Sequence, residues 1–162
     1  MNDFSDTDDF ITDTVNTYSD TMYRVAFNIT KNSEDALDVC QDVFVRLMKN
    51  KEKIKDKAHL KAWLLRATIN CAKNNCAQAY KRHCISSDTV IETSGCNDFE
   101  RTELFDAVIR LPEKYRTHIH HFYYEDLSTA EIADVLKITK ASVKSRLFRA
   151  REMLKKSIEK EN

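Results

Sequence analysis

The strongest chemical signal in this sequence is the basic stretch TKASVKSRLFRAREMLKK, residues 139–156. Four apolar residues recur in it at spacings of four, three and four, which predicts one amphipathic helix with a single packing face. They are Val143, Leu147, Ala150 and Leu154. The other faces carry lysine and arginine, whose charges favour phosphate. Those basic residues are Lys140, Lys144, Arg146, Arg149, Arg151, Lys155 and Lys156. We therefore expect a nucleic-acid contact here; the alternative is an ordinary solvated helix face.

A shorter helix is predicted immediately upstream, in STAEIADVL, residues 128–136. Ser128 and Glu131 form the S-x-x-E pattern of a capping box, which opens a helix. Its core-facing residues should be Ile132, Ala133 and Leu136. A tight turn separates the two helices, with Lys137 expected in a left-handed conformation and Thr139 as the next N-cap. This layout predicts a helix-turn-helix, whose second helix enters the major groove of DNA.

The composition predicts an all-α fold around these elements. One glycine and one proline occur in 162 residues, 42% of the chain is apolar, and helical periodicity runs through most of it. The net charge of zero is a sum over unequal blocks. Residues 51–83 hold nine bases and two acids, and residues 136–162 hold nine bases and three acids. Because phosphate binding needs local charge, two separate basic zones are compatible with contacts at two places on a polyanion.

Three helices are expected before residue 83. The first runs from about residue 8 to 30, and its inward stripe should be Ile11, Val15, Tyr18, Met22, Val25 and Ile29. Ser33 should cap the second, which should bury Ala36, Leu37, Cys40, Val43, Phe44, Leu47 and Met48. The outer face of that helix carries Asp35, Asp38, Gln41, Asp42 and Val45. The third, about 58–80, should bury Leu60, Leu64, Ala67 and Cys71 and turn Lys61, Arg66, Asn70, Lys73 and Asn74 outward.

Residues 84–100 lose the helical period and gather small polar and acidic residues, which predicts a flexible acidic linker. A fourth helix should span 101–110. Another should begin with Pro112 at its first position and run through Tyr124. It should present Tyr115, Ile119, Phe122 and Tyr123 to the core. The predicted organisation is therefore a first domain (1–83), a linker (84–100) and a helix-turn-helix domain (101–162).

Several classes of protein are disfavoured. Five cysteines without a C-x-x-C pair favour reduced thiols in a cytoplasmic protein, and neither a signal peptide nor a membrane span is expected. Three histidines, His118, His120 and His121, invite a metal interpretation, but no cysteine or carboxylate completes a tetrahedral set. We expect them to be partly buried at a domain surface, with possible pH sensitivity. No catalytic centre and no cofactor are expected.

Three segments together resemble the small extracytoplasmic-function (ECF) group of the sigma-70 family of bacterial RNA polymerase sigma factors. They are SEDALDVCQDVFVRLMK (33–49), LKAWLLRATINCAKN (60–74), and LPEKYR (111–116) continuing to LSTAEIADVLKITKASVKSRLFRARE (127–152). The resemblance implies a subunit that binds core polymerase, recognises promoter DNA at its −10 and −35 elements, and melts the duplex. It also implies control by an anti-sigma protein, and a linker that lies in the polymerase channel.

The resemblance assigns candidate residues to three surfaces. The surface for the clamp helices of the largest polymerase subunit would be Asp35, Asp38, Gln41 and Asp42. The −10 element would be melted and held by Lys61, Trp63, Arg66, Asn70, Lys73 and Asn74. The −35 element would meet Lys140, Ser142, Lys144, Ser145, Arg146 and Arg149 in the recognition helix. Trp63 can either stack on an unpaired base or simply belong to the core.

Two other functions fit parts of the sequence. A conventional helix-turn-helix repressor or activator would use its N-terminal helices for dimerisation and bind a palindromic site. A helical adaptor that binds only proteins would not need the basic face at all.

Overall fold

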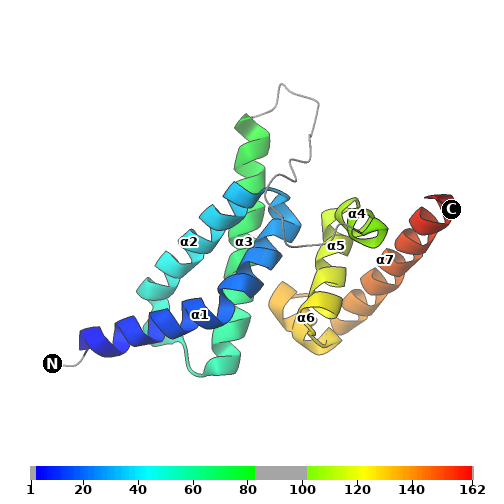
Figure 1. The fold of residues 1–162 in the computed structure, drawn as a ribbon. Coiled ribbons are helices and arrows are strands. Elements are labelled where there is room, and N and C mark those ends of the chain that lie inside the picture. The colour runs from blue at the N-terminus through cyan, green and yellow to red at the C-terminus, as the bar shows by residue number, and fades with distance from the viewer. Residues whose placement is uncertain (1–2, 83–101, 162) are drawn as a thin grey trace. The chain divides into compact units, whose positions relative to one another are not determined.

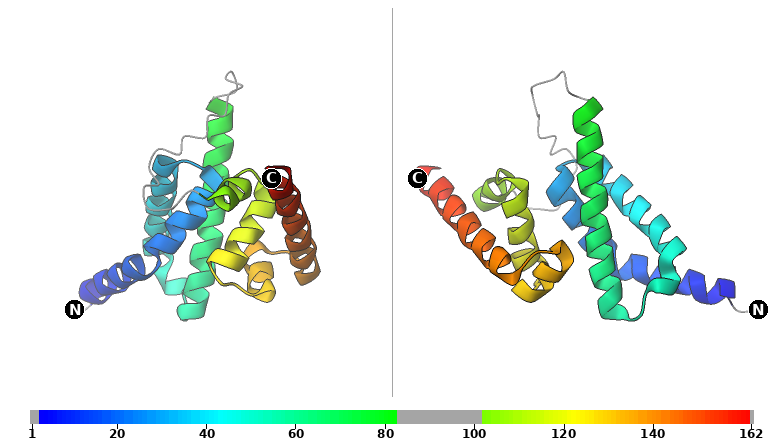
Figure 2. Two further views of the ribbon diagram at one scale, coloured as in Figure 1. Left: turned by 45° about the vertical axis from the view of Figure 1, so that its right-hand side comes forward. Right: turned by 180° about the vertical axis from the view of Figure 1, so that it is seen from behind.

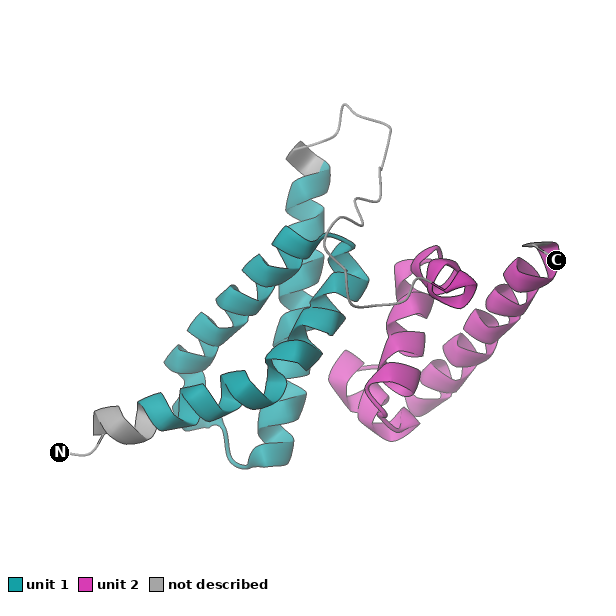
Figure 3. Ribbon diagram, in the orientation of Figure 1, with its two compact units in different colours: residues 1–90 teal, residues 91–162 magenta. Residues whose placement is uncertain are grey.

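The computed structural model describes residues 3–82 and 102–161, and these two ranges form helices without any strand. The all-α prediction is confirmed. Contacts divide the chain into two compact units, residues 1–90 and 91–162 (Figures 1 and 3). The predicted linker, 84–100, lies outside the described residues. Across 3–82 and 102–161, no helix is both long enough and apolar enough to cross a membrane.

The first unit is three helices that each pack against the other two (Figure 2). They are α1 (Asp3–Thr30), α2 (Ser33–Asn50) and α3 (Lys57–Arg82), with a 3-10 turn η1 (Lys51–Lys53) after α2. The core is formed where their apolar stripes meet, at Met22, Val25, Val43, Leu47 and Leu64. On α1, only the carboxyl-terminal part of the predicted stripe is buried. Its amino-terminal members Ile11, Val15 and Tyr18 remain partly exposed.

The predicted cap of α2 was wrong by one residue. Asn32, in extended conformation, accepts a hydrogen bond from the Asp35 N–H at 3.0 Å and is the N-cap. The Ser33 hydroxyl is instead paired with the Tyr23 hydroxyl at 3.1 Å. Between the two helices, Lys31 has a φ of 56° and donates its N–H to the Phe27 carbonyl, and Asn32 follows it with an extended backbone.

The buried face of α2 also differs from the prediction. Leu37 and Met48, expected in the core, are 53% and 56% exposed, whereas Val39 is 1% exposed. The buried stripe follows one helical face, Ala36, Val39, Cys40, Val43 and Leu47. Apolar residues surround most of α2, so periodicity alone does not say which arc α1 and α3 will cover.

In the second unit, α7 runs alongside three shorter helices (Figure 1). The elements are α4 (Glu103–Ile109), α5 (Glu113–Ile119), a π-helical turn η2 (His120–Tyr124), α6 (Thr129–Leu136) and α7 (Lys140–Glu161). Thr102 caps α4 by accepting the Phe105 N–H at 3.1 Å. Pro112 is the N-cap residue of α5 and not its first helical position, a displacement of one residue. The buried Arg116 donates to the Leu111 carbonyl at 2.8 Å and so ties the α4–α5 turn to α5.

The π-helical turn changes which residues of this segment reach the core. The Glu125 N–H donates to the His120 carbonyl, five residues back, and the helical phase shifts. Tyr123, predicted in the core, lies in this turn and is 51% exposed, and Phe122 is only partly buried. Tyr115, in α5 before the turn, is also only partly buried. Ile119 is buried as predicted.

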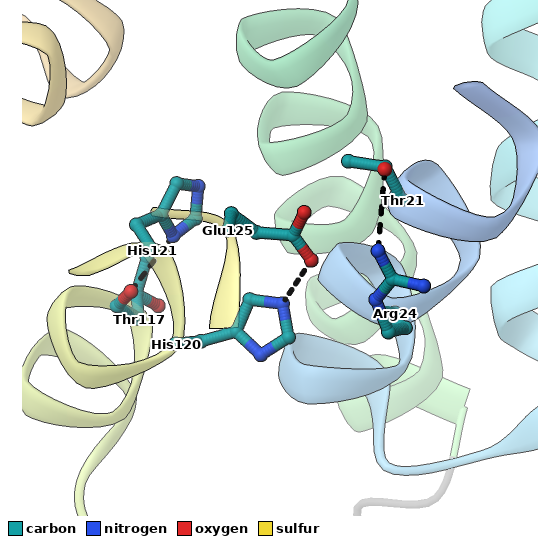
Figure 4. Close-up of polar contacts among 6 residues, drawn as sticks. All are labelled: Thr21, Arg24, Thr117, His120, His121 and Glu125. Atoms are coloured by element: carbon teal, nitrogen blue, oxygen red, sulfur yellow. Dashed lines mark hydrogen bonds and ion pairs between the residues drawn. The ribbon is translucent and has the colours of Figure 1, made fainter. Parts of the chain in front are cut away.

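The three histidines are more deeply buried than predicted. His118 and His121 are each 1% exposed, and His120 is 7% exposed. The Nδ1 of His118 pairs with the Lys114 carbonyl. Figure 4 shows the other pair, in which the Nδ1 of His121 lies 2.7 Å from the Thr117 carbonyl oxygen. The Nε2 of His120 lies 3.2 Å from Glu125 Oε1. Burial, followed by the charge of His120, lowers the pKa of His121 from 6.5 to about 4.

Candidate nucleic-acid interface

The helix-turn-helix begins with the predicted capping box. The Glu131 N–H donates to Ser128 Oγ at 3.1 Å, and the Ser128 N–H reaches Glu131 Oε1 at 3.5 Å. Both bonds satisfy amide donors that a helix start otherwise leaves without partners. On the inner face of α6, Ile132 and Val135 are buried. Ile132 was predicted in the core and Val135 was not. Ala133 and Leu136, also predicted in the core, are only partly buried.

The turn also adopts the predicted conformation. Lys137 is left-handed, with φ 55° and ψ 46°, and the N–H groups of Lys137 and Ile138 both donate to the Ala133 carbonyl. Thr139 then starts α7, because its Oγ1 accepts the Ser142 N–H at 3.1 Å. Both ends of the turn are thus hydrogen-bonded, which fixes the direction in which α7 leaves α6.

The apolar stripe of α7 is used for packing, so its cations are left for solvent. Val143, Leu147 and Ala150 are buried against the unit, and Leu154 is partly buried. Four of the predicted recognition residues are exposed, namely Lys140, Lys144, Ser145 and Arg149. The other two, Ser142 and Arg146, are partly exposed. The second unit therefore does not bury this basic face against its own core.

A surface hollow of about 430 Å³ lies between α5 and the first half of α7. It gathers four of the predicted residues, Ser142, Ser145, Arg146 and Arg149, together with Ala141, Lys114 and Tyr115. Lys140 and Lys144 do not line it. Lys114 and Tyr115 were not predicted as site residues; the only sequence signal was their place in LPEKYR, and Tyr115 was expected in the core.

Tyr115 lies among the cations of this hollow. The Lys114 ammonium lies 4.9 Å from the centre of the Tyr115 ring, and Arg149 lines the same hollow. The interaction with Arg149 is the main cause that holds the pKa of Tyr115 below its ordinary value, with Lys114 acting in the same direction.

A second candidate surface lies on α3 of the first unit. Trp63, Arg66, Asn70, Lys73 and Asn74 share one side of the helix at 100° per residue, and Lys61 falls on the opposite side. Asn70, Lys73 and Asn74 are exposed, whereas Trp63 and Arg66 are partly buried. Trp63 is thus not a fully buried core residue.

A third candidate surface is the outer face of α2. Asp38, Gln41 and Asp42 are exposed, and Asp35 is partly buried. Exposed Leu37, Val45 and Met48 lie with Gln41 in one apolar stripe beside the acids. The sequence prediction assigned the acids to this face but put Leu37 and Met48 in the core.

The side chains of residues 3–82 and 102–161 do not form a metal site. No group of three histidine, cysteine, aspartate or glutamate side chains there could hold an ion. Cys40 and Cys71 are buried free thiols, and burial raises the pKa of Cys40 to about 11. Such a thiol is a poor nucleophile at neutral pH.

Two family models match this chain, one in each compact unit. The model of sigma-70 region 2 matches residues 14–82, and the model of sigma-70 region 4 matches residues 101–154. The ECF RNA polymerase sigma factor SigL of Mycobacterium tuberculosis is 30% identical over 148 residues, which covers 85% of this chain and 82% of SigL. The RNA polymerase sigma factor SigV of Bacillus subtilis is 29% identical and covers 87% of this chain and 86% of its own length.

Two solved structures share the fold. The sigma factor RpoE, in its complex with the anti-sigma factor NepR from Bartonella quintana, matches with a TM-score of 0.75 at 17% identity over 98% of both chains. CnrH, in complex with the cytosolic domain of CnrY, matches with a TM-score of 0.69 at 18% identity, over 94% of this chain and 89% of CnrH.

Proposed function

Since this chain belongs to the ECF group of the sigma-70 family and is an RNA polymerase sigma factor, we propose a role for each of its three surfaces. The basic face of α7 reads the −35 element, one side of α3 holds the melted −10 strand, and the outer face of α2 binds core polymerase. The chain acts as a specificity subunit without catalytic activity of its own, in the cytoplasm.

The proposed −35 contacts are Lys140, Ser142, Lys144, Ser145, Arg146 and Arg149. Their support is that α7 buries Val143, Leu147 and Ala150, whereas four of the six proposed contacts are exposed and Ser142 and Arg146 are partly exposed. Arg146 is the candidate base reader, and a bidentate arginine–guanine pair is worth about 1–3 kcal/mol of discrimination. Lys144 and Arg149 are assigned to phosphates.

The proposed −10 contacts on α3 are Trp63, Arg66, Asn70, Lys73 and Asn74, with Lys61 retained as a more distant backbone contact. A partly exposed indole beside cations and amides suits a single strand, because stacking on an aromatic ring is worth about 1–3 kcal/mol per base. The spacing on one side of α3 supports the first five residues better than Lys61.

The proposed polymerase contacts are Asp35, Asp38, Gln41 and Asp42, to which we add the exposed apolar stripe of Leu37, Val45 and Met48. Acids beside an unpartnered apolar stripe suit a basic helical partner, as the clamp helices of the largest subunit would provide. An anti-sigma protein is a further proposed partner, because the structural neighbour RpoE is bound to the anti-sigma factor NepR.

The observation that carries the −35 role is the exposed basic half of α7 after a fully capped turn. The test is the double charge reversal Lys144→Glu with Arg146→Glu, read out as start-site-specific transcription by core polymerase carrying the variant. We expect a loss of at least tenfold, with unchanged polymerase binding and circular dichroism.

The matched control is Lys155→Glu with Lys156→Glu, which makes the same charge change at exposed positions near the other end of α7. It should retain most activity. Equal losses in both variants would refute the assignment, since the effect would then come from net charge. Tight binding of the isolated protein to a palindromic duplex would favour a conventional repressor or activator instead.

A further inference from the structure

The helix that leads into the helix-turn-helix ends in the π-helical turn η2. The Glu125 N–H donates to the His120 carbonyl at 3.2 Å. The Leu127 N–H donates to the His121 carbonyl at 3.0 Å. Between these two amides, Asp126 has a φ of 54°, a left-handed conformation that is unfavourable for a residue with a Cβ. Backbone of this kind persists only where surrounding contacts hold it, and π-helical turns are often found at functional sites.

One side-chain cluster joins η2 to the middle of α7. Arg151 donates from Nε to the Tyr123 hydroxyl at 2.7 Å. Its guanidinium carbon lies 5.5 Å from the centre of the Tyr123 ring and 5.5 Å from that of Phe122. The two rings meet edge to face at 4.9 Å. A hydrogen bond from a charged donor and a cation–π contact therefore act between the same two elements.

We propose that Tyr123 and Arg151 are positioning residues of the helix-turn-helix: their contact holds the π-helical turn and fixes α7 against the segment that follows α5. The proposal rests on the DNA-binding role proposed for α7, but it assigns neither residue to DNA.

The position of the contact along α7 is the reason for this role. The Thr139 cap fixes the start of the helix, and Arg151 lies about 18 Å further along the axis. The apolar packing between these points is non-directional, whereas a hydrogen bond has a preferred geometry. A second directional attachment therefore restricts the tilt and rotation of α7.

Three conservative variants separate this contact from its surroundings. Tyr123→Phe removes the hydroxyl and keeps the ring. Arg151→Lys keeps the charge and loses the planar Nε donor. Tyr124→Phe is the matched control, because it removes a hydroxyl from the neighbouring tyrosine, which is 45% exposed and stacks on His120. Since Tyr123 and Arg151 are exposed, the first two changes should have little effect on global stability.

The first measurement is amide hydrogen exchange of the full chain by NMR. We expect the amides of Glu125 and Leu127 to exchange roughly threefold to tenfold faster in Tyr123→Phe and in Arg151→Lys. The double variant should match the faster single variant within about twofold, because both changes break one contact. The Ile132 amide, which donates to the Ser128 carbonyl in α6, should change by less than about twofold.

The second measurement is the affinity of the same variants for a 20-base-pair duplex by fluorescence anisotropy, in a salt series that starts near 10 mM. Tyr123→Phe and Arg151→Lys should each weaken binding roughly twofold to fivefold, because a less ordered α7 loses more entropy on binding. The slope of log affinity against log salt should not change, since neither variant removes a cation. Tyr124→Phe should bind and exchange as the unmodified chain does.

Unchanged exchange at Glu125 and Leu127 in Tyr123→Phe would overturn the proposal. Equal acceleration at Ile132 would do the same, because the variant would then unfold globally. Additive effects in the double variant, an equal effect of Tyr124→Phe, or faster exchange with unchanged duplex affinity would also overturn it. If the unmodified chain binds no duplex at the lowest salt, the DNA-binding role proposed for α7 fails, and the exchange data alone decide whether the contact holds the turn.

Discussion

Lys137 is the residue whose backbone conformation determines the direction of α7. Its left-handed backbone lets two consecutive N–H groups reach the Ala133 carbonyl and end α6 abruptly. For a residue with a Cβ this conformation costs about 1–2 kcal/mol, which glycine would avoid. The turn is therefore held by its hydrogen bonds in spite of the residue that occupies it.

Lys137→Gly should stabilise the second unit by about 0.5–1 kcal/mol, because relief of the left-handed penalty exceeds the extra entropy of glycine in the unfolded chain. Lys137→Ala keeps the Cβ and should change stability by less than about 0.5 kcal/mol. Urea unfolding followed by circular dichroism measures both. A glycine variant less stable than the alanine variant would contradict this view of the turn.

His121 makes the second unit sensitive to acid. Its folded pKa of about 4 lies below the ordinary 6.5, so the unfolded chain binds a proton that the folded unit does not. The contribution of neutral His121 to the free energy of unfolding is fully present above pH 6.5 and is lost as the pH falls toward 4. The total loss is roughly 3 kcal/mol. His120 and His118 oppose a charge on His121 as well, while Glu125 favours it.

His121→Gln should flatten the pH dependence between pH 6.5 and 4, even if the variant is less stable throughout. His59→Gln is the control, because His59 is a partly exposed histidine in the first unit whose Nδ1 accepts the Lys55 N–H. The readout is hydrogen exchange of α7 amides as a function of pH. If His121→Gln retains the full acid sensitivity of the unmodified chain, this role for His121 is excluded.

Among the helices, α2 has two apolar faces with different uses. One packs in the core, and the other leaves Leu37, Val45 and Met48 in solvent beside Asp38 and Asp42. Keeping this much apolar surface exposed in one stripe is typical of a helix that binds a partner.

Replacing Leu37, Val45 and Met48 together by glutamine should leave the unfolding midpoint nearly unchanged, since these side chains contribute little to the core. Binding to core polymerase should weaken at least tenfold, as expected when a buried apolar stripe is removed from an interface. Met153→Gln, at an exposed position of α7, should leave polymerase affinity unchanged. A stripe variant that unfolds early but binds normally would assign these residues to the core.

Local sequence rules predicted the α6–turn–α7 segment well, because its capping box, its left-handed turn and its packing stripe depend on near neighbours. The same rules failed where a distant contact or a phase change decided the outcome. Which arc of α2 is covered depends on α1 and α3, and the π-helical turn after α5 rotated Tyr123 out of the core. The hollow was missed because Lys114 and Tyr115 meet Arg149 only through tertiary packing.

Taken as one chain, the protein carries its two proposed DNA surfaces on separate compact units and its proposed polymerase surface on the first. A net charge of zero conceals this arrangement, because each basic zone is offset by acids elsewhere in the sequence. The exposed cations, and not the overall charge, determine where DNA binds.

Mapping transcript 5′ ends made by core polymerase with and without this chain, on fragmented genomic DNA, tests the two-surface promoter model. The model predicts new starts that share two upstream sequence motifs at a fixed spacing, one for α3 and one for α7. Starts identical to those of core polymerase alone, or a single shared motif, would contradict it.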